Sequence, residues 1–163
     1  MEIPNRLFAP FIQSDGHFNL FGITVLPKSI ADPYLKHFHS NLANDVRYRS
    51  LKYYLNALRQ AGLSYHLINF LNGNRDKRLE YIYKTFQECR SQVNELSNGM
   101  PSELREIVKK RVLRTIDLFE RKYELYLELK QINHKEAETL AHRLMCSFGE
   151  DFWRILAKKD RFL

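Results

Sequence analysis

Residues 101–132 read PSELREIVKKRVLRTIDLFERKYELYLELKQI and contain the longest periodic pattern in the chain. Apolar side chains recur in this stretch at spacings of three and four residues, namely Leu104, Val108, Val112, Ile116, Phe119, Tyr123 and Tyr126. This spacing follows the 3.6-residue turn of an α-helix, so these side chains share one face. Pro101 suits a helix start, where its missing N–H costs no hydrogen bond. The pattern predicts one long helix over 101–132 that packs its apolar face on a core.

Further helices are predicted on both sides of this stretch. Before it they cover residues 32–44, 47–61, 65–71 and 76–96; after it one begins at Asn133 and another follows Gly149 and carries Phe152, Trp153 and Leu156. Several helix ends carry residues typical of caps and stops, namely Asp32 before Pro33, Gly62, and the pair Asn133 and Glu136 as a capping box. The helix over 76–96 has a clear apolar stripe that includes Phe86 and Cys89.

The first 28 residues differ from the rest. Two aromatic and β-branched runs, residues 7–12 and 18–26, flank the segment Ser14-Asp15-Gly16-His17. An Asp-Gly pair tolerates the positive φ angles of tight turns, so the segment predicts a β-hairpin. The expected fold is therefore all-α: a helical bundle of about six to seven helices (29–163) with a short N-terminal β-hairpin-like extension (1–28).

Composition excludes several classes of protein. The chain has 163 residues, 26 Lys plus Arg against 19 Asp plus Glu, and 44% hydrophobic residues, which suffice for one domain with a real core. It has no apolar run of about 18 residues and no secretory signal pattern, so neither a membrane span nor export is expected. Cys89 and Cys146 stand apart without metal-ligand spacing, so we expect a reduced, cytoplasmic protein.

The basic residues of the long helix form a strip opposite its apolar stripe. Lys110, Arg114 and Arg121 are separated by four and seven residues and share one face, which Arg111 and Lys122 extend. Acidic residues occupy a separate arc of the helix, and i,i+4 spacing would allow Glu106 to pair with Lys110 and Asp117 with Arg121. Either the strip is an ordinary solvated face or it contacts a polyanion.

Two further basic groups interleave with aromatic and amide residues, which is the chemistry expected for nucleic acid. Guanidinium and ammonium groups neutralise phosphates, and Tyr can stack on an unpaired base. These predicted binding residues are Arg47, Arg49 and Lys52 on the helix over 47–61, and Arg75, Lys77 and Arg78 after Asn72-Gly73-Asn74. A last group follows Trp153 and contains Arg154, Lys158, Lys159 and Arg161. No motif for base-specific recognition of nucleic acid is present. We therefore expect contacts to the sugar-phosphate backbone of single-stranded DNA or RNA.

Catalytic motifs are absent from the sequence. There is no Gly-rich phosphate loop and no nucleophile elbow, and neither cysteine has a local signature of catalysis. His134, Glu138 and His142 fall at i, i+4 and i+8 on one helix face, but the pattern is not a zinc-protease motif. We predict no catalytic residue, no metal and no cofactor, and keep an enzyme built on these histidines as the third alternative.

The helical part of the chain, residues 32–163, resembles the small all-helical subunits of CRISPR Cascade-type effector complexes, which serve antiviral defence. The resemblance rests on the basic helical-bundle organisation, with strand-like residues 1–26 as if cut from a larger subunit. It implies a non-enzymatic role in a ribonucleoprotein complex, with homotypic stacking and DNA contact through basic faces. The leading prediction is thus a non-catalytic nucleic-acid-binding subunit that also contacts other protein subunits. The alternative is a protein-interaction or adaptor module that uses the hairpin as an added strand.

Overall fold

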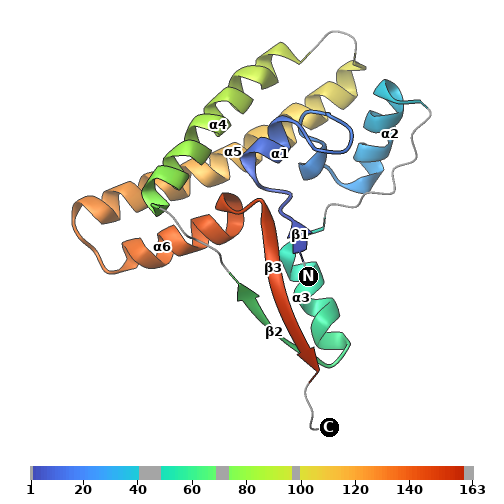
Figure 1. Cartoon of the computed structure of the whole chain (residues 1–163). Coiled ribbons are helices and arrows are strands. Elements are labelled where there is room, and N and C mark those ends of the chain that lie inside the picture. Colours follow the sequence, from blue (N-terminus) through green and yellow to red (C-terminus); the bar gives the residue numbers. More distant parts are fainter. Residues whose placement is uncertain (1, 41–48, 69–73, 97–99, 160–163) are drawn as a thin grey trace.

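The computed structural model describes residues 2–40, 49–68, 74–96 and 100–159, and within these ranges the chain is mostly helical (Figure 1). The helices are α1 (Ala9–Gln13), α2 (Lys28–Phe38), α3 (Leu51–Gln60), α4 (Arg75–Glu95), α5 (Ser102–Gln131) and α6 (Glu136–Leu144). A 3₁₀ turn, η1 (Ile23–Val25), precedes α2, and a π-helical turn, η2 (Met145–Gly149), follows α6. The strands β1 (Glu2–Pro4), β2 (Leu63–Ile68) and β3 (Phe152–Lys159) form one antiparallel sheet in the order β1-β3-β2. The predicted helical bundle is confirmed in outline, and the sheet is a correction to it.

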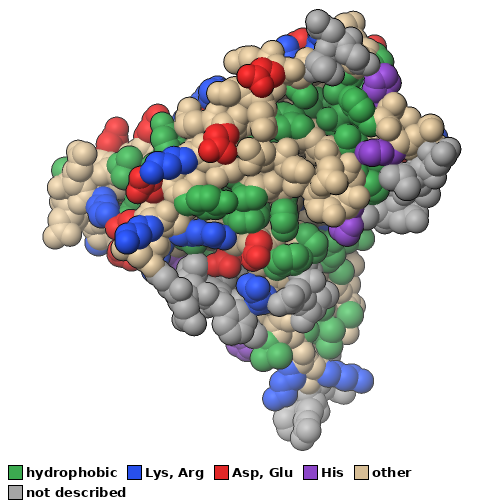
Figure 2. Space-filling view, turned by 45° about the horizontal axis from the view of Figure 1, so that its top comes forward, with side chains coloured by type: hydrophobic (Ala, Val, Ile, Leu, Met, Phe, Trp, Pro, Cys, Tyr) green, Lys and Arg blue, Asp and Glu red, His purple; other side chains and the backbone are tan. Residues whose placement is uncertain are grey.

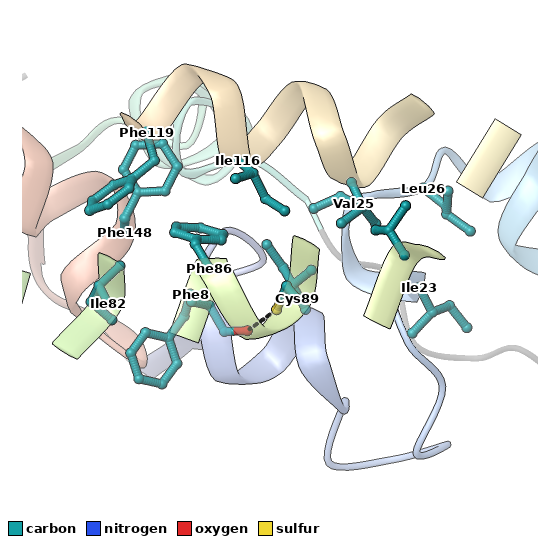
Figure 3. Packing of buried hydrophobic residues seen from close by; sticks show 14 of the residues in the cluster. Phe8, Ile23, Val25, Leu26, Ile82, Phe86, Cys89, Ile116, Phe119 and Phe148 are labelled. Atoms are coloured by element: carbon teal, nitrogen blue, oxygen red, sulfur yellow. Dashed lines mark hydrogen bonds between the residues drawn. The ribbon is translucent and has the colours of Figure 1, made fainter. Parts of the chain in front are cut away.

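The two longest helices, α4 and α5, pack side by side and carry the core (Figure 1). All the apolar residues predicted on the α5 stripe are buried except Leu104, which is half-buried. Phe86 of α4, Phe119 of α5 and Phe148 of η2 meet with ring centroids 5.0 to 6.0 Å apart (Figure 3). The two predicted helices over 76–96 and 101–132 are therefore confirmed, and Asn74 caps α4 by accepting a hydrogen bond from the N–H of Lys77 (3.2 Å).

The N-terminal β-hairpin prediction is wrong. Residues 9–13 form helix α1, and only Glu2–Pro4 are a strand, paired with Phe152–Arg154 rather than with a hairpin partner. The Asp15-Gly16 segment is a loop held by the buried Asp15 carboxylate, which accepts hydrogen bonds from the N–H groups of Phe18 and Leu20, both at 3.0 Å. The apolar runs on both sides lie in the same core as α4 and α5 (Figure 3). Because deleting residues 1–28 would open this core, the hairpin cannot act as a detachable added strand.

Two predicted helices near the sheet are strands instead. The predicted helix over 65–71 is β2 in its described part, and the predicted last helix is β3, with Leu63 paired to Lys159 and Leu67 to Ile155. Trp153 anchors β3 to the helical part, because its indole is buried and its N–H donates to the carbonyl of Cys146 (2.9 Å). A strand forms by pairing with residues that are distant in sequence, so its own residues do not reveal it. A helix, in contrast, shows in the spacing of neighbouring residues.

Helix ends differ from the prediction at several places. Helix α2 ends at Phe38 rather than near residue 44, and α3 begins at Leu51 rather than near residue 47, with Ser50 as its N-cap. Helix α2 begins at Lys28 rather than after Asp32, so Pro33 lies inside it and Asp32 forms an ion pair with Lys28. Asn133 does not cap α6 but ends α5 with a left-handed φ of 51°, and the N–H of His134 donates to the carbonyl of Leu129 (2.8 Å). This is a Schellman motif, which satisfies carbonyls at a helix C-terminus.

The small sheet carries its own minor core. Helix α3 packs beside β2, and its half-buried apolar side chains lie against Trp153 and Ile155 of β3. The predicted stop at Gly62 is confirmed, with φ of 67°. The predicted division of the chain at residue 28 stays a prediction. Among the described residues, no helix combines the length and apolar composition that a membrane span requires.

Candidate nucleic-acid interface

The outer face of α5 carries the predicted basic strip, and every member of the strip is exposed. These side chains are Lys110, Arg111, Arg114, Arg121 and Lys122. The buried stripe fixes the orientation of the helix, because Val112, Ile116 and Phe119 are fully buried and so turn the strip to solvent. Within the described part of the chain, none of the five cations has an ion-pair partner.

Three acidic residues of α5 that lie near the strip bind other cations. Asp117 and Glu120 both bind Arg90 of α4, at 2.8 and 2.5 Å, and these contacts raise the pKa of Arg90. Glu106 lies 3.6 Å from Lys109 rather than against Lys110. The ion pairs expected for Lys110 and Arg121 therefore do not form. Asp117 binds Arg90 of α4 instead of Arg121, and Glu106 lies closer to Lys109 than to Lys110. The cations of the strip are left without an ion pair among the described residues, while the carboxylates of Glu106 and Asp117 stay beside them.

Two shallow grooves follow the strip and meet at Lys110 and Arg114. The larger, about 760 Å³, runs along α5 from Glu106 to Arg121. The smaller, about 490 Å³, lies between α5 and the start of α2, where Ile30 and Ile107 form an apolar wall below Lys110, Arg111 and Arg114. The larger groove also holds the carboxylates of Glu106 and Asp117, whereas the smaller one combines three cations with an apolar wall. Cations beside an apolar wall suit a single strand, whose phosphates and bases are both accessible.

Arg6 adds a cation that the sequence did not single out. Its side chain is half-buried, and burial together with the nearby guanidinium of Arg111 lowers its pKa. Arg6 has no ion-pair partner among the described residues. Two neighbouring guanidinium groups without an acid repel each other, and an anion bound between them would relieve the repulsion. Arg6 could not be found from sequence, because it precedes α1 and reaches α5 only through the fold.

The predicted residues on α3 lie on a separate element beside the sheet. Arg49 and Lys52 are exposed, and the Arg49 guanidinium lies over the ring of Tyr53, 4.9 Å from its centroid. Tyr53 is itself 52% exposed, so this pair offers a flat surface on which a base could stack. Arg47 lies outside the described residues.

The predicted group at the start of α4 is mostly engaged within the protein. Arg75 forms an ion pair with Glu138 of α6. Arg78 donates to the carbonyl of Gly149 (3.0 Å), and its guanidinium lies 5.1 Å from the centroid of the Phe8 ring. Lys77 is exposed, so it alone of this group is available to a ligand.

Basic residues at the far end of the sheet form another exposed group. Lys158 and Lys159 end β3 and are exposed, and Figure 2 shows basic side chains at this tip. Over α4 the same view shows acidic and basic side chains intermixed. Arg161 is not among the described residues.

The three candidate metal residues do not share one helix face, because His134 lies in the turn before α6, and each of them has another contact. The Nδ1 atom of His134 accepts from the N–H of Glu136 (3.2 Å), Glu138 pairs with Arg75, and Nε2 of His142 lies 3.5 Å from the Sγ atom of Cys146. Over the described ranges, no three His, Cys, Asp or Glu side chains converge as a metal site would require.

No protein-family model, curated protein or solved structure matches the chain. The resemblance to small CRISPR effector subunits therefore stays a prediction.

Proposed function

We propose that the protein is a non-catalytic nucleic-acid-binding protein that holds the sugar-phosphate backbone of a single strand on the outer face of α5. The observation that carries the proposal is the strip of unpaired cations Lys110, Arg111, Arg114 and Arg121, whose acidic neighbours bind Arg90 and Lys109 instead. On a surface needed only for solubility, i,i+4 ion pairs would be the ordinary outcome, and within the described residues these cations form none.

Recognition on this face acts through charge rather than base identity. Flexible Lys and Arg side chains reach phosphate oxygens, and the apolar wall of Ile30 and Ile107 accepts a sugar or an unpaired base. We therefore expect little sequence preference and tighter binding to single strands than to duplex. Membership in a larger ribonucleoprotein complex is a further part of the proposal, and it rests on the family resemblance alone.

The test is fluorescence anisotropy of the full chain with a labelled single-stranded oligonucleotide and a matching duplex at several salt concentrations. The logarithm of the association constant should fall linearly with the logarithm of salt, by about 0.7 per contacted phosphate of a single strand. Changing Lys110, Arg114 and Arg121 together to Glu should weaken binding roughly tenfold or more and lower the slope by about 2.

A matched control carries the same change of net charge on other elements. Lys36, Lys135 and Arg143 are exposed, and changing them to Glu should leave most of the affinity in place. Equal losses in the two triple variants would show that only net charge matters and would overturn the assignment to α5. Absence of binding at low salt would reject the proposed function itself.

Arg6→Met separates binding from folding. Met keeps an apolar side chain in the half-buried position but removes the repulsion with Arg111. We expect a higher melting temperature, by about 2 °C, together with weaker nucleic-acid binding. A variant that is less stable and binds normally would contradict the role given to Arg6.

A further inference from the structure

The C-terminal half of α5, together with its C-cap residue Ile132, carries an exposed apolar line that the core does not use. Leu118, Leu125 and Ile132 are 48%, 46% and 71% exposed, and they follow one another at intervals of seven residues. A seven-residue interval keeps side chains on one face of a helix, and it is the repeat by which two helices pack along a seam. Single exposed leucines are common on protein surfaces, but these three large apolar side chains follow one another at the seven-residue repeat of paired helices.

The charges beside the line change sign along the helix. The preceding half of the outer face is basic and contains Arg114 and Arg121, whereas the following half holds Glu124 and Glu128, both exposed. Neither glutamate has an ion-pair partner among the described residues. A surface that is basic at one end and acidic at the other complements a copy of itself turned by 180°.

We propose that two copies of this chain pair through α5 in antiparallel orientation, with the two-fold axis near Leu125. In this register Leu118 of one copy meets Ile132 of the other, Leu125 meets its own counterpart, and Arg121 lies beside Glu128 of the second copy. A parallel pair would place Arg121 beside Arg121 and Glu128 beside Glu128, so charge selects the antiparallel arrangement. This inference is independent of the proposed nucleic-acid binding.

The expected association is weak. One pair of helices buries less than the roughly 1,600 Å² of a standard stable interface, so we expect a dissociation constant in the micromolar range. The proposal therefore requires measurement over a wide range of protein concentration, in the absence of nucleic acid.

Sedimentation velocity of the full chain between about 5 and 300 μM tests the proposal, with concentrations chosen around the expected range. The wild-type chain should shift from monomer to dimer, and Leu125→Glu and Ile132→Glu should each remain monomeric throughout. Leu127→Glu is the matched control, because Leu127 is 39% exposed on the same helix but lies off the line. Circular dichroism confirms that each variant is folded.

A charge swap tests the register. Arg121→Glu should weaken the dimer at least several-fold because it faces Glu128 of the second copy, and adding Glu128→Arg in the same chain should restore the dimer. These two residues lie seven positions apart, about 10 Å along one helix, so the rescue cannot arise within a single copy. A monomeric wild-type chain at all concentrations, or a dimer that survives Leu125→Glu, would overturn the proposal, and failure of the swap would overturn the antiparallel register.

Discussion

A single glycine sets how closely the N-terminal segment approaches α5. Gly22 has φ of 72°, and a Cβ atom built on it would lie 2.6 Å from Cγ2 of Val112 and 3.4 Å from Cγ1 of Val108. The position therefore requires a residue that tolerates a left-handed backbone and has no side chain. Through this contact η1 supports the part of α5 that carries the basic strip on its other side.

Gly22→Ala should lower the free energy of unfolding by about 2–4 kcal/mol, because backbone strain and overpacking against Val112 add. Gly62→Ala is the matched control: Gly62 has φ of 67° but no atom within 4 Å of its Cβ position, so strain alone should cost about 1–2 kcal/mol. Urea unfolding measures both variants. Equal losses of unfolding free energy in the two variants would show that the close contact with Val112 does not contribute to stability.

At the scale of elements, the start of α4 is tied to the end of α5 by one carboxylate. Asp76 accepts hydrogen bonds from Lys130, at 2.6 Å, and from the hydroxyl of Tyr126. These bonds lower the pKa of Asp76, whereas burial and the same contact raise the pKa of Tyr126 to about 12. Asp76 is therefore ionised and Tyr126 protonated at neutral pH, as the hydrogen bonds require.

The pairing makes stability depend on pH in the acid range. Because the folded pKa of Asp76 lies below its unfolded value, its contribution is complete above the unfolded value of 3.8 and is lost as pH falls through the folded pKa. Asp76→Asn should thus destabilise the protein at pH 7 and make little difference at the lowest pH at which it still folds. Urea unfolding at a series of pH values from 7 downward measures this dependence. Glu95→Gln is the control, because Glu95 is an exposed acid of the same helix that has no ion pair among the described residues. A constant difference between wild type and Asp76→Asn at every pH would contradict this account.

At the scale of the whole molecule, the two proposals share part of one surface. The larger groove on α5 is lined by Leu118 and Arg121 as well as by Lys110 and Arg114. Leu118 and Arg121 both belong to the proposed dimer interface, so a strand in the groove and a second copy on α5 exclude each other. A ligand that binds only the monomer shifts the monomer–dimer equilibrium toward the monomer.

Excess single-stranded oligonucleotide should therefore convert the dimer into complexes of one chain with one strand. Sedimentation velocity followed at the absorbance of a label on the strand distinguishes these from complexes of two chains. The variant with only Lys110 and Arg114 changed to Glu serves as control, because it keeps Arg121 for the dimer, and its dimer should respond less to the oligonucleotide. Binding of the strand to an intact dimer would show that the two surfaces do not overlap.

Sequence reasoning succeeded where the pattern is local and failed where distant segments meet. The apolar stripes of α4 and α5 repeat every three to four residues, so they could be found without knowing what covers them. The strand Phe152–Lys159 could not, because its pairing with Leu63–Ile68 joins residues about 90 positions apart. The Asp15-Gly16 pair indicated a hairpin turn, but the buried Asp15 carboxylate folds the loop on itself instead.

The sequence by itself determined the helical core and the exposed cations on α5, since both follow from helical periodicity within one continuous stretch. Only the tertiary structure decided which charges remain unpaired, because Arg90 of α4 takes Asp117 and Glu120 from the same helix face. The same is true of Arg6, which comes near Arg111 only after the N-terminal segment has packed into the core. Side-chain electrostatics depends on distances in space, and those are set by the packing of elements far apart in the chain.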